Sequence, residues 1–153
     1  MIRHVAGIAE IVDDFDAGVR FYREVLGLTV EYEPGSGYAV VAVPGVLHFG
    51  IWARWAAAEA TLGSREHADR IPLGLTVGFE VDGVEEAHRT LTARGWPVAQ
   101  PPKVEEWGQT TSRFFSPSGA LCEVSETPWA RRLAQELRAA DAEDDTSGSG
   151  PAQ

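Results

Sequence analysis

Glu123 is the residue of this chain whose type and surroundings are best suited to chemistry. It lies between Cys122 and Val124 in an extended stretch that follows the turn 116–119, which reads Ser-Pro-Ser-Gly. A carboxylate on the inner face of a sheet can bind a metal ion or a cationic ligand, or act as a general base. A carboxylate on the outer face is an ordinary solvated charge. Strand alternation leaves both orientations of Glu123 open.

His48 is the second candidate for chemistry, because it lies in the apolar stretch 46–52 that is predicted to form a strand. If His48 and Glu123 face each other across a cleft, they can act as a general acid and a general base. Cys122 is expected to be a buried core thiol, because no basic cluster or helix N-terminus is evident nearby to lower its pKa.

Aromatic side chains are the candidates for the walls of a binding cleft. Aromatic faces attract cations and flat heterocycles, and ligand pockets are mostly apolar with a few polar groups. The alternative is that these rings fill the core between sheet and helices. The candidate wall residues are Trp52, Trp107, Tyr38, Phe49 and Phe115.

The elements that must position these residues form a pattern that occurs twice. In the first half, apolar residues at helical spacing predict a helix at 16–26 that Gly27 ends, and one of Asp13 and Asp14 is expected to cap it. The predicted strands around this helix are 3–12, 28–32, 38–43 and 46–52.

The second half repeats this order after a predicted linker at 54–70, which begins with a short amphipathic helix at 54–62. The predicted elements are a strand within 71–81, a helix at 84–93, a strand at 96–99, a turn at 100–102, and strands within 104–115 and at 120–125. A helix at 128–142 and a disordered, acidic and Ser/Gly-rich tail at 143–153 are expected to follow. The fold class is therefore α+β, with one domain at 1–127 made of modules 3–53 and 71–127.

Composition narrows the possible partners. The formal net charge of −10 argues against nucleic acid, which needs a basic face, and suits a cationic ligand. No apolar run is long enough to span a membrane, and no signal peptide is visible. The single cysteine excludes an intramolecular disulfide framework. We therefore expect a cytoplasmic protein that binds neither nucleic acid nor membrane.

Several motifs, in order, resemble the vicinal oxygen chelate superfamily of glyoxalases, extradiol dioxygenases, and bleomycin- and fosfomycin-resistance proteins. The segment 21–27 resembles the family signature Phe-Tyr-x-x-x-Leu-Gly, and 79–82 resembles its counterpart in the second half. Trp107-Gly108, the turn 116–119 and Glu123 resemble its last hairpin, although the usual Asp-Pro-Asp-Gly turn here has serine at both acidic positions. The resemblance covers roughly residues 3–127 and implies two βαβββ modules that form a curved mixed sheet around a cleft.

The resemblance also implies four metal-ligand positions, one on each of four strands. They fall on Gly7, His48, Thr76 and Glu123. Gly7 has no donor and Thr76 is a poor one, so we expect no cofactor; a divalent metal held by His48 and Glu123 is the alternative. A bulge in the first strand would be needed to bring His4 into the set.

Three functions are consistent with these features, and the least specific is a regulatory or interaction role on the same fold. The preferred one is a metal-independent small-molecule binding protein that is similar to the bleomycin-resistance branch and sequesters a cationic or aromatic compound such as an antibiotic. The alternative is a glyoxalase-like lyase or isomerase, or a dioxygenase, that uses His48 and Glu123 with or without a metal. The sequence leaves open whether the protein is an enzyme. A homodimer is expected from the family resemblance and from the apolar stripe of the terminal helix.

Overall fold

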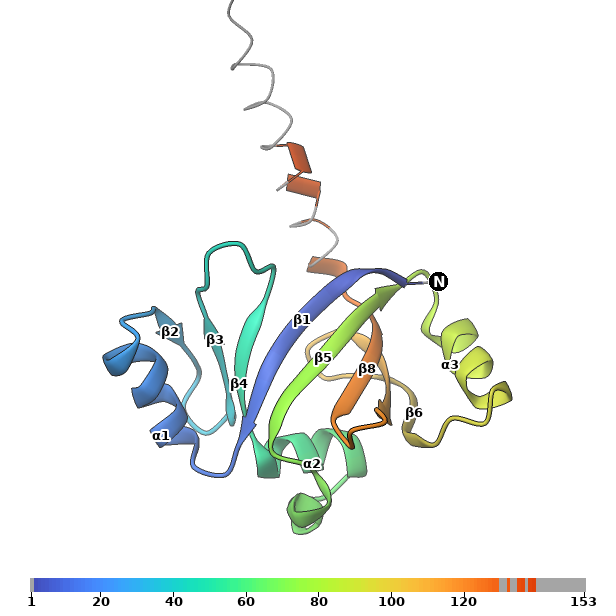
Figure 1. The fold of residues 1–153 in the computed structure, drawn as a ribbon, viewed down its shortest axis with the longest axis horizontal. Helices are drawn as coiled ribbons and strands as arrows, with labels where there is room; N and C mark the ends of the chain where they lie inside the picture. The colour runs from blue at the N-terminus through green and yellow to red at the C-terminus, as the bar shows by residue number, and fades with distance from the viewer. Residues whose placement is uncertain (1, 130–131, 133–134, 137, 140–153) are drawn as a thin grey trace, which may run out of the picture.

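The chain folds around one open, curved sheet of eight strands, shown in Figure 1. The computed structural model describes residues 2–129, 132, 135, 136, 138 and 139. The predicted α+β class is confirmed. Of the predicted helix at 128–142, the described residues are 128, 129, 132, 135, 136, 138 and 139, and all are helical; its other residues and the predicted tail at 143–153 lie outside the described residues. Among the described residues, no helix has the length and apolar character needed to cross a membrane.

The first module follows the predicted order of strand, helix and three strands. Its elements are β1 (Ile2–Val12), α1 (Phe15–Arg20), a π-helical turn (Phe21–Val25), β2 (Val30–Glu31), β3 (Tyr38–Val41) and β4 (Phe49–Ala53). Asp14 caps α1, since its carboxylate accepts a hydrogen bond of 2.8 Å from the backbone N–H of Ala17. Gly27, with φ of 69°, ends the helical segment as predicted. β2 is shorter than expected, and β4 begins three residues later than expected.

The second module begins after α2 (Arg54–Leu62) and a 3-10 helix (Arg65–Arg70), which occupy the range in which a linker was predicted. Its elements are β5 (Gly74–Val81), α3 (Val84–Ala93), β6 (Val98–Val104), β7 (Thr110–Phe115) and β8 (Leu121–Glu126). The predicted turn at 100–102 is wrong, because β6 continues through both prolines. β6 is the outermost strand and its pairing with β7 contains register shifts. Proline is tolerated at such edges and bulges because it has no N–H to donate.

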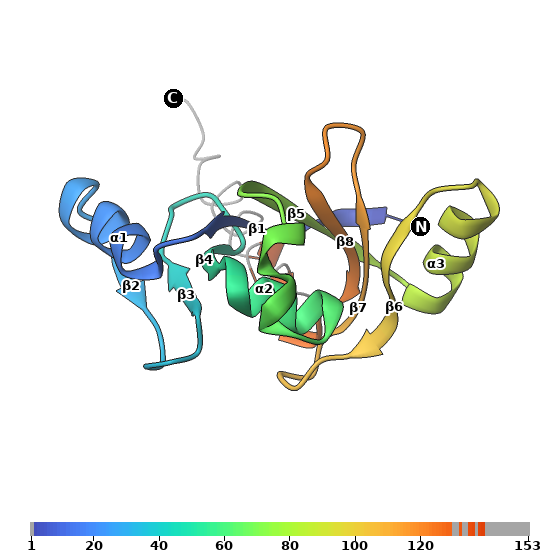
Figure 2. The same cartoon turned by 90° about the horizontal axis from the view of Figure 1, so that it is seen from below.

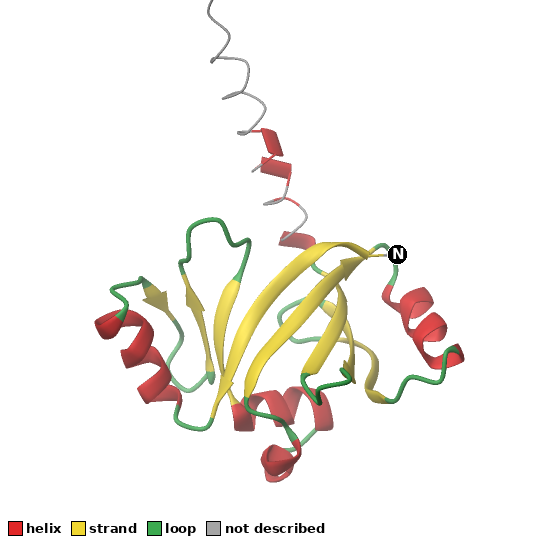
Figure 3. Ribbon diagram, in the orientation of Figure 1, coloured by secondary structure: helices red, strands yellow, loops and turns green. Residues whose placement is uncertain are grey.

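The two modules join through their first strands within one chain. The strand order is β2-β3-β4-β1-β5-β8-β7-β6, with β1 antiparallel to β5 at the centre. Within each module the first and last strands are parallel neighbours, β1 with β4 and β5 with β8. Figures 1 and 2 show α1 and α3 at opposite ends of the sheet, while α2 lies across one edge of the concave side. Figure 3 shows the same division by element type.

Three apolar clusters hold the helices to the sheet and so fix the shape of the concave face. Val19 of α1 packs with Ile51 of β4, and Ala87 of α3 packs with Val124 of β8. The third cluster joins α2 to the sheet and includes Trp52. Trp52 therefore has a rigid backing on the side away from solvent.

Candidate active or binding site

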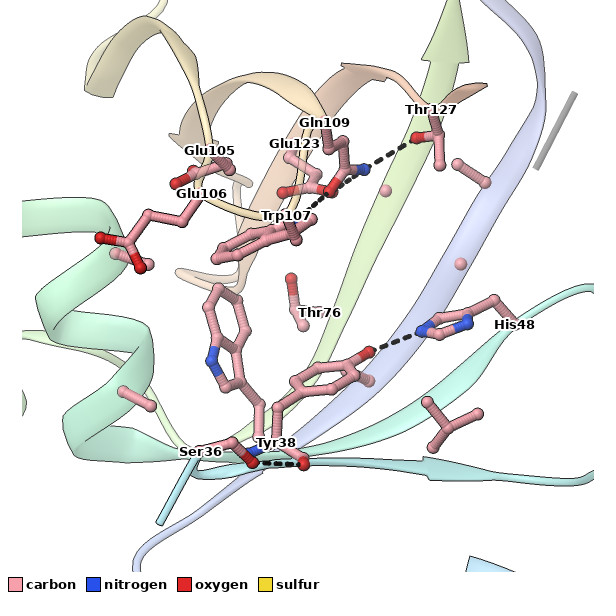
Figure 4. A pocket seen from close by; sticks show the side chains of 18 of the residues that line it. Ser36, Tyr38, His48, Thr76, Glu105, Glu106, Trp107, Gln109, Glu123 and Thr127 are labelled. Carbon is pink, nitrogen blue, oxygen red and sulfur yellow. Dashed lines mark hydrogen bonds between the residues drawn. The ribbon is translucent and has the colours of Figure 1, made fainter. Parts of the chain in front are cut away.

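A cavity of about 1080 Å³ occupies the concave side of the sheet. Strands β1, β4, β5 and β8 form its floor, and the connection between β2 and β3, the helix α2 and the turn between β6 and β7 form its sides. Figure 4 shows side chains from these separate elements pointing into one space. His48 and Glu123, the two candidates for chemistry, both line it.

Two paired glycines form the middle of the floor. Gly7 of β1 lies opposite Gly78 of β5. A Cβ atom at Gly7 would lie 3.1 Å from Cδ2 of His48, and one at Gly78 would lie 3.0 Å from Oε1 of Glu123. A side chain at either glycine would therefore press on the imidazole or the carboxylate and displace it by a few tenths of an ångström.

His48 and Tyr38 form a hydrogen-bonded pair on one side of this floor. The Tyr38 hydroxyl lies 2.7 Å from Nε2 of His48, and the two rings are parallel (Figure 4). Burial lowers the pKa of His48. Burial, and then the charge of Glu123, raise the pKa of Tyr38. At neutral pH the tyrosine is therefore protonated and the histidine uncharged, so the hydroxyl can donate to Nε2.

Glu123 is held by a buried arginine on the other side of the floor. Nε of Arg113 donates to Oε2 of Glu123 over 3.0 Å, and Gln109 donates to Oε1 over 3.3 Å. Arg113 is 1% exposed, and its guanidinium also binds Glu105 over 2.7 Å and lies over the Trp52 ring. Both oxygens of Glu123 are thus already hydrogen-bonded within the protein.

Gln109 connects this charge pair to the turn that borders the cavity. It accepts a hydrogen bond of 2.9 Å from the Trp107 indole and donates one of 2.8 Å to the Thr127 hydroxyl (Figure 4). The turn is closed by Gly108, which has φ of 88°. The indole of Trp107 is therefore oriented by a fixed amide, although its side chain is half exposed.

Three of the five predicted aromatic wall residues line the cavity, namely Tyr38, Trp52 and Trp107. The structure places the other two elsewhere. Phe49 lies on the opposite face of β4, where it packs near Tyr22, because successive strand residues face opposite ways. Phe115 packs against the core cluster of α2. Tyr32 and Trp129 also line the cavity and were not identified from the sequence.

The cavity lining carries an excess of negative charge. Its charged side chains are Glu31, Glu33, Glu59, Glu105, Glu106 and Glu123 against Lys103 and Arg113. Glu105 is neutralised by Lys103 and Arg113, and Glu59 pairs with Arg65. In the described part of the chain, no ion pair involves Glu31, Glu33 or Glu106, which are exposed at the rim.

The residues at the four expected metal positions do not fit a divalent ion. Gly7 offers no donor, and Thr76 offers only a hydroxyl. A metal bound to Glu123 would lie beside the Arg113 guanidinium, which repels it. The described residues contain no group of three or more His, Cys, Asp or Glu side chains that could hold a metal. β1 does contain register shifts between Ile2 and His4 and between Val5 and Gly7, but His4 is not part of the cavity lining.

The model of the Glyoxalase/Bleomycin resistance protein/Dioxygenase superfamily matches residues 2–124. The chain therefore belongs to this superfamily, in agreement with its two βαβββ modules and concave cavity. Among curated protein sequences, none matches the chain significantly.

Solved structures share the fold at low sequence identity. A superfamily member from Vibrio splendidus 12B01 is 20% identical with a TM-score of 0.54, over 83% of this chain and 100% of that one. A methylmalonyl-CoA epimerase from Mycobacterium tuberculosis is 19% identical with a TM-score of 0.56, over 86% and 93%. The Streptomyces coelicolor epimerase in complex with 2-nitronate-propionyl-CoA is 17% identical with a TM-score of 0.54, over 84% and 99%. These likenesses support the fold alone.

Proposed function

We propose that this protein binds a small cationic aromatic compound in its cavity and does so without a metal ion, in the manner of the bleomycin-resistance branch. Sequestering an antibiotic of this chemistry is the role that fits best. The observation that carries the proposal is the combination of aromatic walls with an acidic rim in one cavity of about 1080 Å³.

The volume and the walls suit a drug-sized ligand with a flat ring system. Binding pockets of this size bury most of such a ligand. Trp107 presents a half-exposed indole to the cavity, and Trp52 and Tyr38 form an edge-to-face pair in its wall. Aromatic faces of this kind stabilise a ring cation by stacking and by cation–π attraction.

The negative charge of the cavity rim favours a cationic ligand over an anionic thioester. Glu31, Glu33 and Glu106 are exposed at the cavity without an ion-pair partner in the described residues. They attract a cation and repel a phosphate group. Coenzyme A derivatives, which the solved epimerase complexes contain, carry several phosphate charges and would meet this repulsion.

The test is isothermal titration calorimetry with two flat tricyclic probes of opposite charge, proflavine (a cation) and anthracene-9-carboxylate (an anion). We expect the wild type to bind proflavine and to bind the anion at least roughly tenfold more weakly. The triple variant Glu31→Gln, Glu33→Gln, Glu106→Gln should lose roughly three- to tenfold in proflavine affinity, because each exposed charge contributes about 0.2–0.5 kcal/mol.

The matched control is the triple variant Glu24→Gln, Glu85→Gln, Glu86→Gln. It removes the same net charge from exposed positions that do not line the cavity. It should keep nearly the wild-type affinity. Equal losses in the two triple variants, or equal binding of both probes, would contradict the proposal.

A second candidate function is proton transfer at a carbon next to a carbonyl, as in an isomerase or lyase. The observation that favours it is the uncharged His48 beside Tyr38 in the same cavity as Glu123. His48 would remove the proton and the Tyr38 hydroxyl would return one, while the ionised Glu123 would orient the substrate as a hydrogen-bond acceptor. Incubation with methylmalonyl-CoA in D₂O, followed by NMR, should then show deuterium at the α-carbon. His48→Gln should abolish this exchange, whereas an absence of exchange with the wild type would remove this substrate from consideration.

A further inference from the structure

Arg113 bridges two carboxylates, that of Glu105 in the turn between β6 and β7 and that of Glu123 in β8. Its Nη1 donates to Oε1 of Glu105 over 2.7 Å, and its Nε donates to Oε2 of Glu123 over 3.0 Å. The Arg113 and Glu105 side chains are 1% and 2% exposed, and that of Glu123 is 18% exposed. Two carboxylates that contact one guanidinium and are this shielded from water repel each other strongly unless a cation lies between them.

The guanidinium is therefore a structural counter-charge, and its surroundings hold it in one position. It lies 5.3 Å from the centre of the Trp52 ring, and Gln100 accepts a further hydrogen bond from it. Lys103 adds a second positive charge, 3.1 Å from Glu105. The two carboxylates are thus matched by two cations of the chain itself.

We propose that the Arg113 guanidinium occupies the electrostatic place of a divalent metal ion between Glu105 and Glu123. The superfamily includes dioxygenases and glyoxalases, and Glu123 lies where the resemblance implies a metal ligand. In this chain the positive charge of Arg113 neutralises the carboxylate of Glu123. Glu123 is then an oriented hydrogen-bond acceptor in the cavity wall, and the site rejects metal. The inference concerns the same cavity, but it rests on no particular ligand.

The inference predicts that removing the positive charge of Arg113 creates a metal site. Arg113→Met keeps much of the length and the apolar stem but leaves Glu105 and Glu123 facing each other. Carboxylate oxygens suit Mn²⁺, whose free form is measured by electron paramagnetic resonance. We expect the wild type to leave the Mn²⁺ spectrum unchanged, and Arg113→Met to bind Mn²⁺ at least roughly tenfold more tightly than the wild type.

Two control variants separate the charge from general damage to the site. Arg113→Lys keeps a cation at the position and should not gain Mn²⁺ binding. The double variant Arg113→Met, Glu105→Gln removes one of the two carboxylates and should lose the gain. If Arg113→Met is poorly folded in buffer, Mn²⁺ should restore its thermal transition, because a ligand that binds only the folded state stabilises it.

Two results would overturn the inference. One is Mn²⁺ binding by the wild type as tight as that of Arg113→Met. The other is an Arg113→Met protein whose Mn²⁺ affinity and thermal transition are no better than those of the wild type. Proflavine titrations on the same wild-type sample keep the two proposals apart. A wild type that ignores both Mn²⁺ and proflavine supports the Arg113 inference and contradicts the proposed function.

Discussion

At the level of single residues, the half-buried His48 makes the stability of the fold sensitive to acid. Burial lowers the pKa of His48 below its ordinary value of 6.5. As the pH falls through about 6.5, the unfolded chain takes up a proton that the folded chain excludes until lower pH, so stability decreases. The contribution of His48 is therefore fully present above this range and is lost as the pH falls toward its lowered pKa.

We predict that His48→Gln removes this part of the acid sensitivity. Calorimetric Tm values measured between about pH 7 and pH 5 should fall more steeply for the wild type than for the variant. His67→Gln, which changes a histidine outside the cavity lining, is the control and should follow the wild type. Parallel curves for the wild type and His48→Gln would disprove the prediction.

Gly50 gives a second prediction at this scale, since the Tyr38 ring lies directly over it. A Cβ atom at Gly50 would lie 2.1 Å from the Tyr38 hydroxyl oxygen and 2.5 Å from Cζ. Gly50→Ala should cost about 1–3 kcal/mol in urea unfolding, as other overpacked sites do. In a Tyr38→Ala background the same substitution should cost much less, and additive effects of the two changes would contradict the predicted clash.

The site was predictable from the sequence in part. His48 and Glu123 were identified by their types, and the structure brings both into one cavity. Arg113 was missed, although the hairpin register places it directly opposite Glu123. Cross-strand pairs of opposite charge are a known stabilising pattern, so counting back from the turn at 116–119 would have found it. The pairing of Gly7 with Gly78 depends on the contact between modules, which no local pattern shows.

At the level of secondary-structure elements, two neighbouring aspartates before α1 have unequal roles. Asp14 accepts the cap hydrogen bond from Ala17, whereas Asp13 makes only a long contact of 3.4 Å with Arg54. Asp14→Ala should lower the free energy of unfolding by about 0.5–2 kcal/mol. Asp13→Ala should lower it by less than about 0.5 kcal/mol, because exposed ion pairs contribute little. Chemical denaturation of both variants measures the difference, and the reverse order would contradict this assignment.

Helices were predicted more accurately than strands, for a physical reason. Helices α2 and α3 have the predicted bounds, 54–62 and 84–93, because their apolar spacing and terminal glycines are local signals. The prediction placed a turn in the middle of β6, because Pro101 and Pro102 indicate a turn when only the local sequence is considered. Their compatibility with a strand depends on β6 being the sheet edge, which is a property of the whole sheet.

At the level of the whole molecule, the outer face of the two central strands is only partly covered. Thr76 and Gly78 line the cavity. Because successive strand residues face opposite ways, Leu75 and the residues two and four positions after it point to the other face of the sheet. Leu75 is 58% exposed, and Val5 of β1 is 44% exposed. Apolar side chains that are this exposed on a sheet face favour association with another surface.

We therefore predict that the protein is a homodimer that uses this face. Light scattering after size exclusion should give twice the chain mass of 16.5 kDa. Leu75→Lys should shift the protein toward monomer while proflavine affinity is retained, because the side chain lies outside the cavity. A wild type that is monomeric at micromolar concentration would contradict the prediction.

The two glycines of the cavity floor, Gly7 and Gly78, are also positions at which point mutations can change the binding site. Every glycine codon is one base change from codons for larger residues such as alanine and valine. Strand pairing uses backbone atoms, so a substitution at Gly7 or Gly78 can leave the ladder in place while it displaces His48 or Glu123. A gene of this kind can therefore alter the shape of its binding site, and with it the compounds that the protein accepts, in single mutational steps at the centre of the sheet.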